Sequence, residues 1–129
     1  MNPIYAALAV GAGAVLGALL RWWAGLWLNP LWQGFPLGTL LVNLAGGLVA
    51  GGAFAYLQRE PNDLMRLLLV TGGLGALTTF STFSVEVVAM LQHGRFLLAF
   101  GTAELHLIGS LALPLLDMRM AGGWFPPTT

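Results

Sequence analysis

Four long apolar stretches dominate the sequence and constrain its fold more than any other feature. They cover residues 4–28, 37–57, 67–91 and 96–116. Each has the length of about 20 mostly apolar residues that a helix needs to cross a bilayer. We therefore predict an all-α membrane protein with four transmembrane helices in one domain, residues 1–117. We expect the remaining tail, 118–129, to be disordered, since it is rich in glycine and proline.

Charged residues are too scarce to cover a water-facing surface. They make up 8% of the chain, and hydrophobic residues make up 57%. A soluble domain carries roughly 25% charged residues. Five basic and five acidic residues leave no basic surface for nucleic acid, and the absence of cysteine excludes disulfides and thiolate metal sites. The lipid bilayer is therefore the predicted surrounding of most of the chain.

The basic residues are divided almost equally between the two sides of the predicted bundle. Arg59, Arg66 and Arg119 fall on the side that holds both termini, and Arg21 and Arg95 fall on the other. The orientation of a membrane protein follows the bias of such residues between its two sides. A bias of three to two is weak. It indicates either one weakly determined orientation or insertion in both orientations with antiparallel pairing.

The second stretch carries a polar stripe although it contains no charge. Thr39 and Asn43 lie one helical turn apart in this stretch. A polar side chain in hydrocarbon is costly unless it is paired. Asn43 is therefore predicted either to hydrogen-bond a neighbouring helix or to contact a transported solute.

The third stretch contains a segment that weakens a helix. It reads Gly72-Gly73-Leu74-Gly75-Ala76-Leu77-Thr78-Thr79-Phe80-Ser81-Thr82-Phe83-Ser84-Val85-Glu86. Glycine destabilises a helix interior, and a break at membrane depth is tolerated where protein buries it or where it lines a cavity. The carbonyls freed by such a break commonly bind small cations. The segment therefore predicts either a functional break or a harmless kink whose backbone is satisfied by hydroxyl groups.

Together these patterns resemble the Fluc (CrcB) family of fluoride channels. The matching positions are Gly17, Arg21, Trp22, Gly38, Thr39, Asn43, Gly75, Thr78, Thr79, Phe80, Ser81, Thr82, Phe83, Ser84 and Glu86. The resemblance covers residues 4–116. It implies an antiparallel, dual-topology homodimer in a bacterial inner membrane, which exports fluoride passively from the cytoplasm and lowers its concentration there.

The resemblance also implies roles for single residues. The backbone carbonyls of Gly75 and Thr78 would hold a structural sodium ion that is not transported. The fluoride pores would be lined by Asn43, Thr79, Phe80, Ser81, Thr82 and Phe83, with Arg21 and Glu86 toward the pore ends. Neutral hydrogen-bond donors and the positive edges of aromatic rings suit a small anion, and they bind weakly enough to release it.

The fourth stretch adds a stripe that we also assign to the pore, with the alternative that its histidine, His106, only hydrogen-bonds a neighbouring helix. Thr102, His106 and Ser110 are four residues apart, so they share one face of a helix, and each can donate a hydrogen bond. Many family members carry a tyrosine and serines on this stripe, so the sequence departs from that pattern. Glu104 lies about 200° around the helix from Thr102. We expect its carboxyl group to be protonated or hydrogen-bonded away from the pores.

Other functions find less support in the sequence. Two histidines and five scattered acidic residues form neither a metal cluster nor a nucleophile–base pair, so we expect no enzyme. The main alternative is a proton-coupled exporter of the small multidrug-resistance type, which also has four spans and dual topology. Such exporters have an acidic residue midway along the first span, and residues 4–28 contain none. A structural subunit without transport activity is a further alternative.

Overall fold

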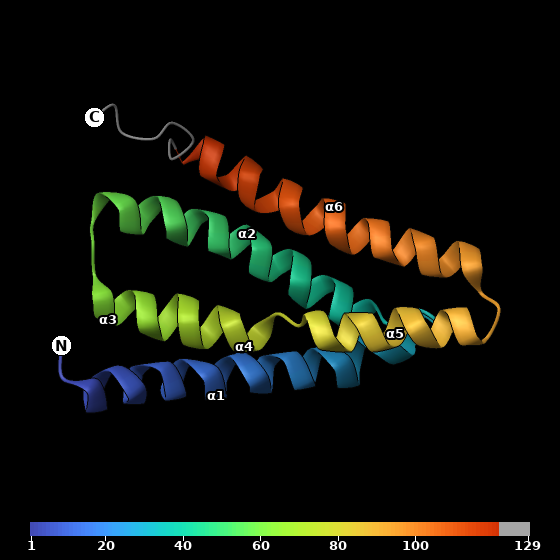
Figure 1. The fold of residues 1–129 in the computed structure, drawn as a ribbon, viewed down its shortest axis with the longest axis horizontal. Coiled ribbons are helices and arrows are strands. Elements are labelled where there is room, and N and C mark those ends of the chain that lie inside the picture. Colours follow the sequence, from blue (N-terminus) through green and yellow to red (C-terminus); the bar gives the residue numbers. More distant parts are fainter. Residues whose placement is uncertain (122–129) are drawn as a thin grey trace.

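The computed structural model describes residues 1–121, which form helices joined by short loops. The four long helical segments are α1 (Pro3–Leu28), α2 (Leu37–Arg59), the composite segment Asp63–Gln92 and α6 (Phe96–Met120). Helix α1 begins at the end of the molecule where α6 ends, and the loop between α2 and the composite segment lies there too (Figure 1). Each segment is long and apolar enough to cross a membrane. The predicted four apolar helices are thereby confirmed.

The predicted tail is described only in part. Helix α6 continues through Met120, three residues beyond the domain boundary expected at residue 117. The expected disorder of residues 122–129 concerns a segment outside the described residues.

A side-chain cap begins α1, and a residue just after its end holds the start of α2. The side chain of Asn2 accepts a 2.9 Å hydrogen bond from the Ile4 amide, and Pro3 occupies the first turn, where no helical partner for its nitrogen is needed. The helix leads into a short 3₁₀ turn, η1 (Asn29–Leu31). Here Asn29 Oδ1 accepts a 2.7 Å hydrogen bond from the Gly38 amide. This bond ties the first loop to the start of α2.

The third segment consists of several helical pieces. They are α3 (Asp63–Met65), the π-helix η2 (Arg66–Leu74), α4 (Gly75–Leu77) and α5 (Phe80–Gln92). Thr78 and Thr79 between α4 and α5 are extended, with ψ angles of 152° and 115°. Figure 1 shows them as a thin connection between the two helices. Thr79 Oγ1 then caps α5 by accepting a 3.1 Å hydrogen bond from the Thr82 amide.

Glycines bring α1 close to the third segment, and α1 packs along η2 and α4. A Cβ atom added to Gly13 would overlap the carbonyl oxygen of Leu68, and one added to Gly72 would overlap that of Val10. Small residues let membrane helices approach closely in this way, because lipid provides no hydrophobic force to drive helices together. These glycines therefore serve packing.

Helix α2 packs along α6 on the other side of the bundle. A Cβ atom on Gly51 of α2 would overlap the carbonyl of Pro114, which lies within α6. Proline has no amide hydrogen, so the Ser110 carbonyl four residues earlier lacks its usual helical donor. Toward the opposite end, an apolar cluster closes the bundle with Phe35, Leu40, Met90 and Ala99.

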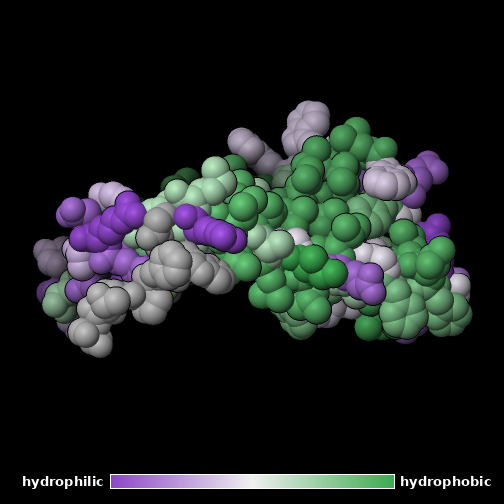
Figure 2. Space-filling view, turned by 90° about the horizontal axis from the view of Figure 1, so that it is seen from above, coloured by the Kyte–Doolittle hydropathy of each residue, from purple (hydrophilic) through white to green (hydrophobic). Residues whose placement is uncertain are grey.

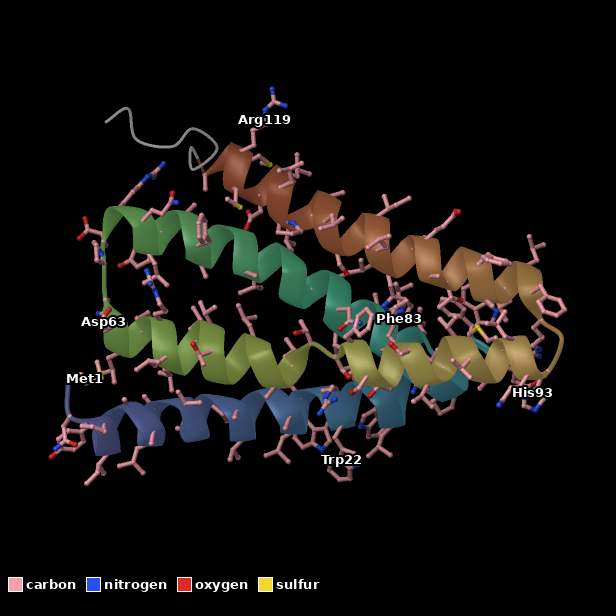
Figure 3. The ribbon with its side chains drawn as sticks, in the orientation of Figure 1. Met1, Trp22, Asp63, Phe83, His93 and Arg119 are labelled. Carbon is pink, nitrogen blue, oxygen red and sulfur yellow. The ribbon has the colours of Figure 1, made fainter. Side chains whose placement is uncertain are left out.

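The outer surface of the bundle is largely apolar. Figure 2 shows hydrophobic residues over most of the middle and right of one face, and hydrophilic residues gathered at its left end. Trp22, Trp23 and Trp27 are exposed near the end of α1, and Trp22 points away from the bundle (Figure 3). Tryptophan is enriched where a membrane meets water. This surface is suited to lipid with an interfacial belt at one end.

Candidate ion pathway

A cavity of about 470 Å³ lies where α2, the α4–α5 break and α6 meet. Predicted site residues from all three elements line it: Asn43, Gly75, Thr78, Thr79, Phe80, Phe83, His106 and Ser110. Small or apolar residues such as Gly46, Gly47 and Pro114 form much of the remaining wall. The cavity therefore presents a few polar groups on an otherwise apolar lining.

Asn43 holds the backbone of the break in place. Its Oδ1 accepts a 2.8 Å hydrogen bond from the Thr79 amide, and its Nδ2 donates a 3.1 Å hydrogen bond to the Thr79 carbonyl. The Thr79 amide would otherwise be orphaned at membrane depth, where an unpaired backbone group costs several kcal/mol. The Thr79 carbonyl, at the N-cap of α5, gains a partner in addition to its helical one. In the described subunit, Asn43 therefore acts as a contact between helices, one of its two predicted roles.

His106 completes this network from α6. Its Nδ1 lies 3.0 Å from Asn43 Nδ2, and the imidazole is only 3% exposed. Its other nitrogen, Nε2, is buried and has no hydrogen-bond partner among the described residues. His106 therefore lines the cavity, with Nδ1 close to Asn43 and with Nε2 buried and unpartnered within the described residues.

An aromatic pair extends from this histidine. The ring of Phe83 stacks on the His106 ring at a centroid distance of 4.3 Å, and Phe80 meets Phe83 edge-on at 5.7 Å. Phe83 points from α5 toward α2 and α6 (Figure 3). Phe80 is 79% exposed, so its ring projects from the subunit. Phe83 belongs to the cavity wall, whereas Phe80 stands at its outer edge.

A second cavity, of about 460 Å³, lies nearer the loop end of α1. It brings together Arg21, Thr39, Thr79 and Thr82. Thr79 Oγ1 donates a 3.0 Å hydrogen bond to Thr82 Oγ1 and lies 3.3 Å from Ser81 Oγ. The predicted hydroxyl residues thus form one cluster at the start of α5, and Thr79 lines both cavities.

Glu86 lies beyond this cluster and is bonded to α2. Its Oε1 accepts a 2.6 Å hydrogen bond from the Thr39 hydroxyl, while its Oε2 is buried without a partner among residues 1–121. A third cavity, of about 680 Å³, is lined by Glu86, His93 and Arg95 among others. The Thr39–Asn43 stripe was visible in the sequence, but the pairing of Thr39 with Glu86 was not.

The three residues of the α6 stripe differ in their surroundings. Thr102 is completely buried, and its hydroxyl donates to the Leu98 carbonyl at 2.7 Å and lies 3.5 Å from Met90 Sδ. It does not belong to the lining of the central cavity, whereas His106 and Ser110 do. Glu104 is exposed on another face of α6.

The two residues predicted to hold a cation, Gly75 and Thr78, both line the central cavity, at the start and just beyond the end of α4. The Thr79 amide donates to Asn43, whereas in a continuous helix it would donate to the Gly75 carbonyl. The Thr78 hydroxyl donates to the Leu74 carbonyl at 2.9 Å, and Thr78 is the C-cap residue of α4. Among the described residues, no three His, Cys, Asp or Glu side chains form a possible metal site. The oxygen atoms at the break come instead from the backbone and from the side chains of Asn43, Thr78 and Thr79.

Comparisons with known proteins agree over most of the chain. The family model described as "CrcB-like protein, Camphor Resistance (CrcB)" matches residues 8–118. The chain is 53% identical to a protein of Albidiferax ferrireducens over 123 residues, 94% of both chains. It is 55% identical to a protein of Bordetella petrii over 116 residues, 88% of this chain and 89% of the other. Both of these proteins are named fluoride-specific ion channel FluC.

Proposed function

The chain belongs to the CrcB family, and from this premise we propose that it is a channel through which fluoride crosses a membrane passively. The resemblance seen in the sequence is confirmed by the match over residues 8–118 and by relatives of about half identity. The chain is accordingly a multi-pass membrane protein and not an enzyme. Its relatives' name supports fluoride as the conducted ion.

The buried Nε2 of His106 is the structural observation that carries this proposal. A buried polar atom without a partner is unfavourable unless a solute or water meets it. The neighbouring Phe83 ring stacks on this histidine, and a phenyl ring has a positive edge that can face an anion. Fluoride requires replacement of its water shell by such donors, and neutral ones release it again.

We further propose that a structural sodium ion binds at the break and is not transported. The carbonyls of Gly75 and Thr78 would provide ligands, because a hard cation prefers oxygen atoms. The diversion of the Thr79 amide to Asn43 fits this assignment, since it removes the usual helical donor of the Gly75 carbonyl. A cation here would lower the energy of an anion in the same low-dielectric region.

The same proposal includes an antiparallel homodimer of dual topology in a bacterial inner membrane. The weak arginine bias supports insertion in both orientations. The projecting ring of Phe80 supports a partner, since it stands at the open edge of the cavity. Passive export of fluoride would then lower its concentration in the cytoplasm.

Flux from proteoliposomes tests the proposed function. Purified protein should release trapped fluoride rapidly and passively, while trapped chloride in matched vesicles is retained. Absence of selective fluoride release would contradict the proposal. Proton-dependent uptake of an organic cation would instead favour the small multidrug-resistance type of exporter.

A further inference from the structure

We propose that Asn43 is a positioning residue, which holds His106 in the tautomer that presents an Nε2–H donor to the central cavity. This inference rests on the proposed function, because it names the donor that meets the anion there. It assigns the contact to His106 and gives the amide of Asn43 an indirect role.

The backbone of Thr79 fixes the orientation of the Asn43 amide. The oxygen and nitrogen of an amide side chain are distinguished by their hydrogen-bond partners. The Thr79 amide can only donate, so the atom 2.8 Å from it must be the oxygen of Asn43. The Thr79 carbonyl can only accept, so the atom 3.1 Å from it must be the nitrogen. Two backbone groups of one residue therefore determine the orientation independently.

The orientation of the Asn43 amide in turn determines the tautomer of His106. Asn43 Nδ2 has two hydrogens and no acceptor capacity, and it lies 3.0 Å from His106 Nδ1. Nδ1 must therefore accept, and in a neutral imidazole the single proton then lies on Nε2. The tautomer of His106 is thus determined by the backbone of the α4–α5 break, through one intervening amide.

One hydrogen-bond donor of this network then remains for an anion. Both hydrogens of the Asn43 amide are used, one by the Thr79 carbonyl and one by His106. His106 Nε2 is buried, belongs to a residue that lines the cavity and has no partner among the described residues. The Nε2–H group is therefore the available donor of this network. The opposite tautomer would place a lone pair at the same position and repel an anion.

The nitrogen-15 spectrum of histidine-labelled, full-length protein tests the tautomer directly. Protonated and unprotonated ring nitrogens have well-separated shifts, and the signals missing in His106→Ser identify this residue. At a pH where the ring is neutral, we expect Nε2 protonated and Nδ1 bare. In Asn43→Asp, a carboxylate faces Nδ1, so Nδ1 should become protonated. A protonated Nδ1 in the wild type, or a bare Nδ1 in Asn43→Asp, would overturn the proposal.

A double-mutant cycle on fluoride flux tests the indirect role. Residues in one hydrogen-bond network are expected to be non-additive. Asn43→Ala should lower flux about tenfold in the wild-type background and have a much smaller effect once His106→Ser is present. Ser110→Ala is the matched control, because Ser110 lines the same cavity without contacting Asn43, and its effect should multiply with that of Asn43→Ala. Equal losses in the wild-type and His106→Ser backgrounds would overturn the proposal.

The two measurements separate this inference from the proposed function. A wild-type protein that passes no fluoride would refute the proposed function, and the spectra would still decide the tautomer. Size-exclusion profiles of each variant show whether the fold survives. Asn43→Asp keeps an acceptor for the Thr79 amide. The spectra therefore still test the proposal if Asn43→Ala, the variant used in the flux cycle, fails to fold.

Discussion

The hydroxyl of Thr39 donates a 2.6 Å hydrogen bond to Glu86 Oε1 and so joins α2 to α5 across 47 positions of the sequence. Thr39 is buried, and the second carboxyl oxygen of Glu86 is buried as well. An acidic side chain at membrane depth needs such a partner, because an unpaired one is expensive in hydrocarbon. The bond therefore stabilises the bundle where the second and third cavities approach each other.

Thr39→Val should remove the only donor to Glu86 found within residues 1–121. We expect a loss of about 1–3 kcal/mol in stability, the usual cost of leaving a buried polar group unsatisfied. Thermal unfolding in detergent measures this loss. Thr39→Ser is the control, because it keeps a hydroxyl group at the same position. Equal melting temperatures for Thr39→Val and the wild type would show that the bond contributes nothing.

Replacement of Phe80 and replacement of Phe83 should affect fluoride flux differently, because only Phe83 stacks on His106. Phe83→Ile removes both the ring edge and the stacking on His106, so fluoride flux should fall at least about tenfold. Phe80→Ile should also reduce flux, but it removes no contact to His106. Flux assays beside size-exclusion profiles distinguish these effects from misassembly. Normal flux in both variants would show that the rings serve packing alone.

Gly13→Ala should destabilise the protein, because the added Cβ atom overlaps the Leu68 carbonyl and the backbone must move. Overpacking of this kind costs about 1–3 kcal/mol. Gly11→Ala on the same helix is the matched control, since a Cβ atom there meets nothing within 4 Å. Alanine also favours a helix over glycine, so Gly11→Ala should be neutral or slightly stabilising. The two melting temperatures should therefore shift in different directions, and equal shifts would refute the packing argument.

Removal of sodium should weaken the dimer or abolish flux if the ion is bound at the break. Within the subunit a Cβ atom on Gly75 would meet the Val70 carbonyl at 3.6 Å, an ordinary contact. Gly75→Val should therefore leave the subunit folded while its side chain fills part of the proposed ion site. Gly101→Val is the control, since Gly101 has open space around it. Unchanged fluoride flux after verified sodium removal would contradict the assignment.

A tag at the C-terminus should be accessible from both sides of the membrane. This follows from insertion in two orientations, which the weak arginine bias permits. Labelling of intact and permeabilised vesicles with an impermeant reagent measures the two populations. Labelling from one side only would rule out dual topology, and a monomer in detergent and in lipid would rule out the homodimer.

The helix boundaries could be predicted because local chemistry sets them. The predicted second stretch, 37–57, corresponds to α2 at Leu37–Arg59, which follows Pro36 and ends shortly before Pro61. Proline cannot continue a helix interior, and charged residues prefer the membrane surface. Such signals lie next to the boundaries that they determine, so one sequence suffices to identify them.

The hydrogen-bond network could not be predicted, because it depends on tertiary structure. Asn43 meets Thr79 and His106, which are 36 and 63 positions away. From its helix alone it could equally have contacted a solute. Thr102 shows the same limit, since helical spacing places it on the His106 face, but Met90 of α5 covers that end of the stripe. Periodicity identifies a face of a helix and leaves open what covers it.

Thr79 forms part of the wall of both the central and the second cavity. Their other lining residues place the two cavities one after the other along the helices, the second nearer the loop end of α1 and the start of α2. An ion that moved from one cavity to the other would pass Thr79, whose backbone is held by Asn43. A larger side chain at this single position would narrow both cavities at once.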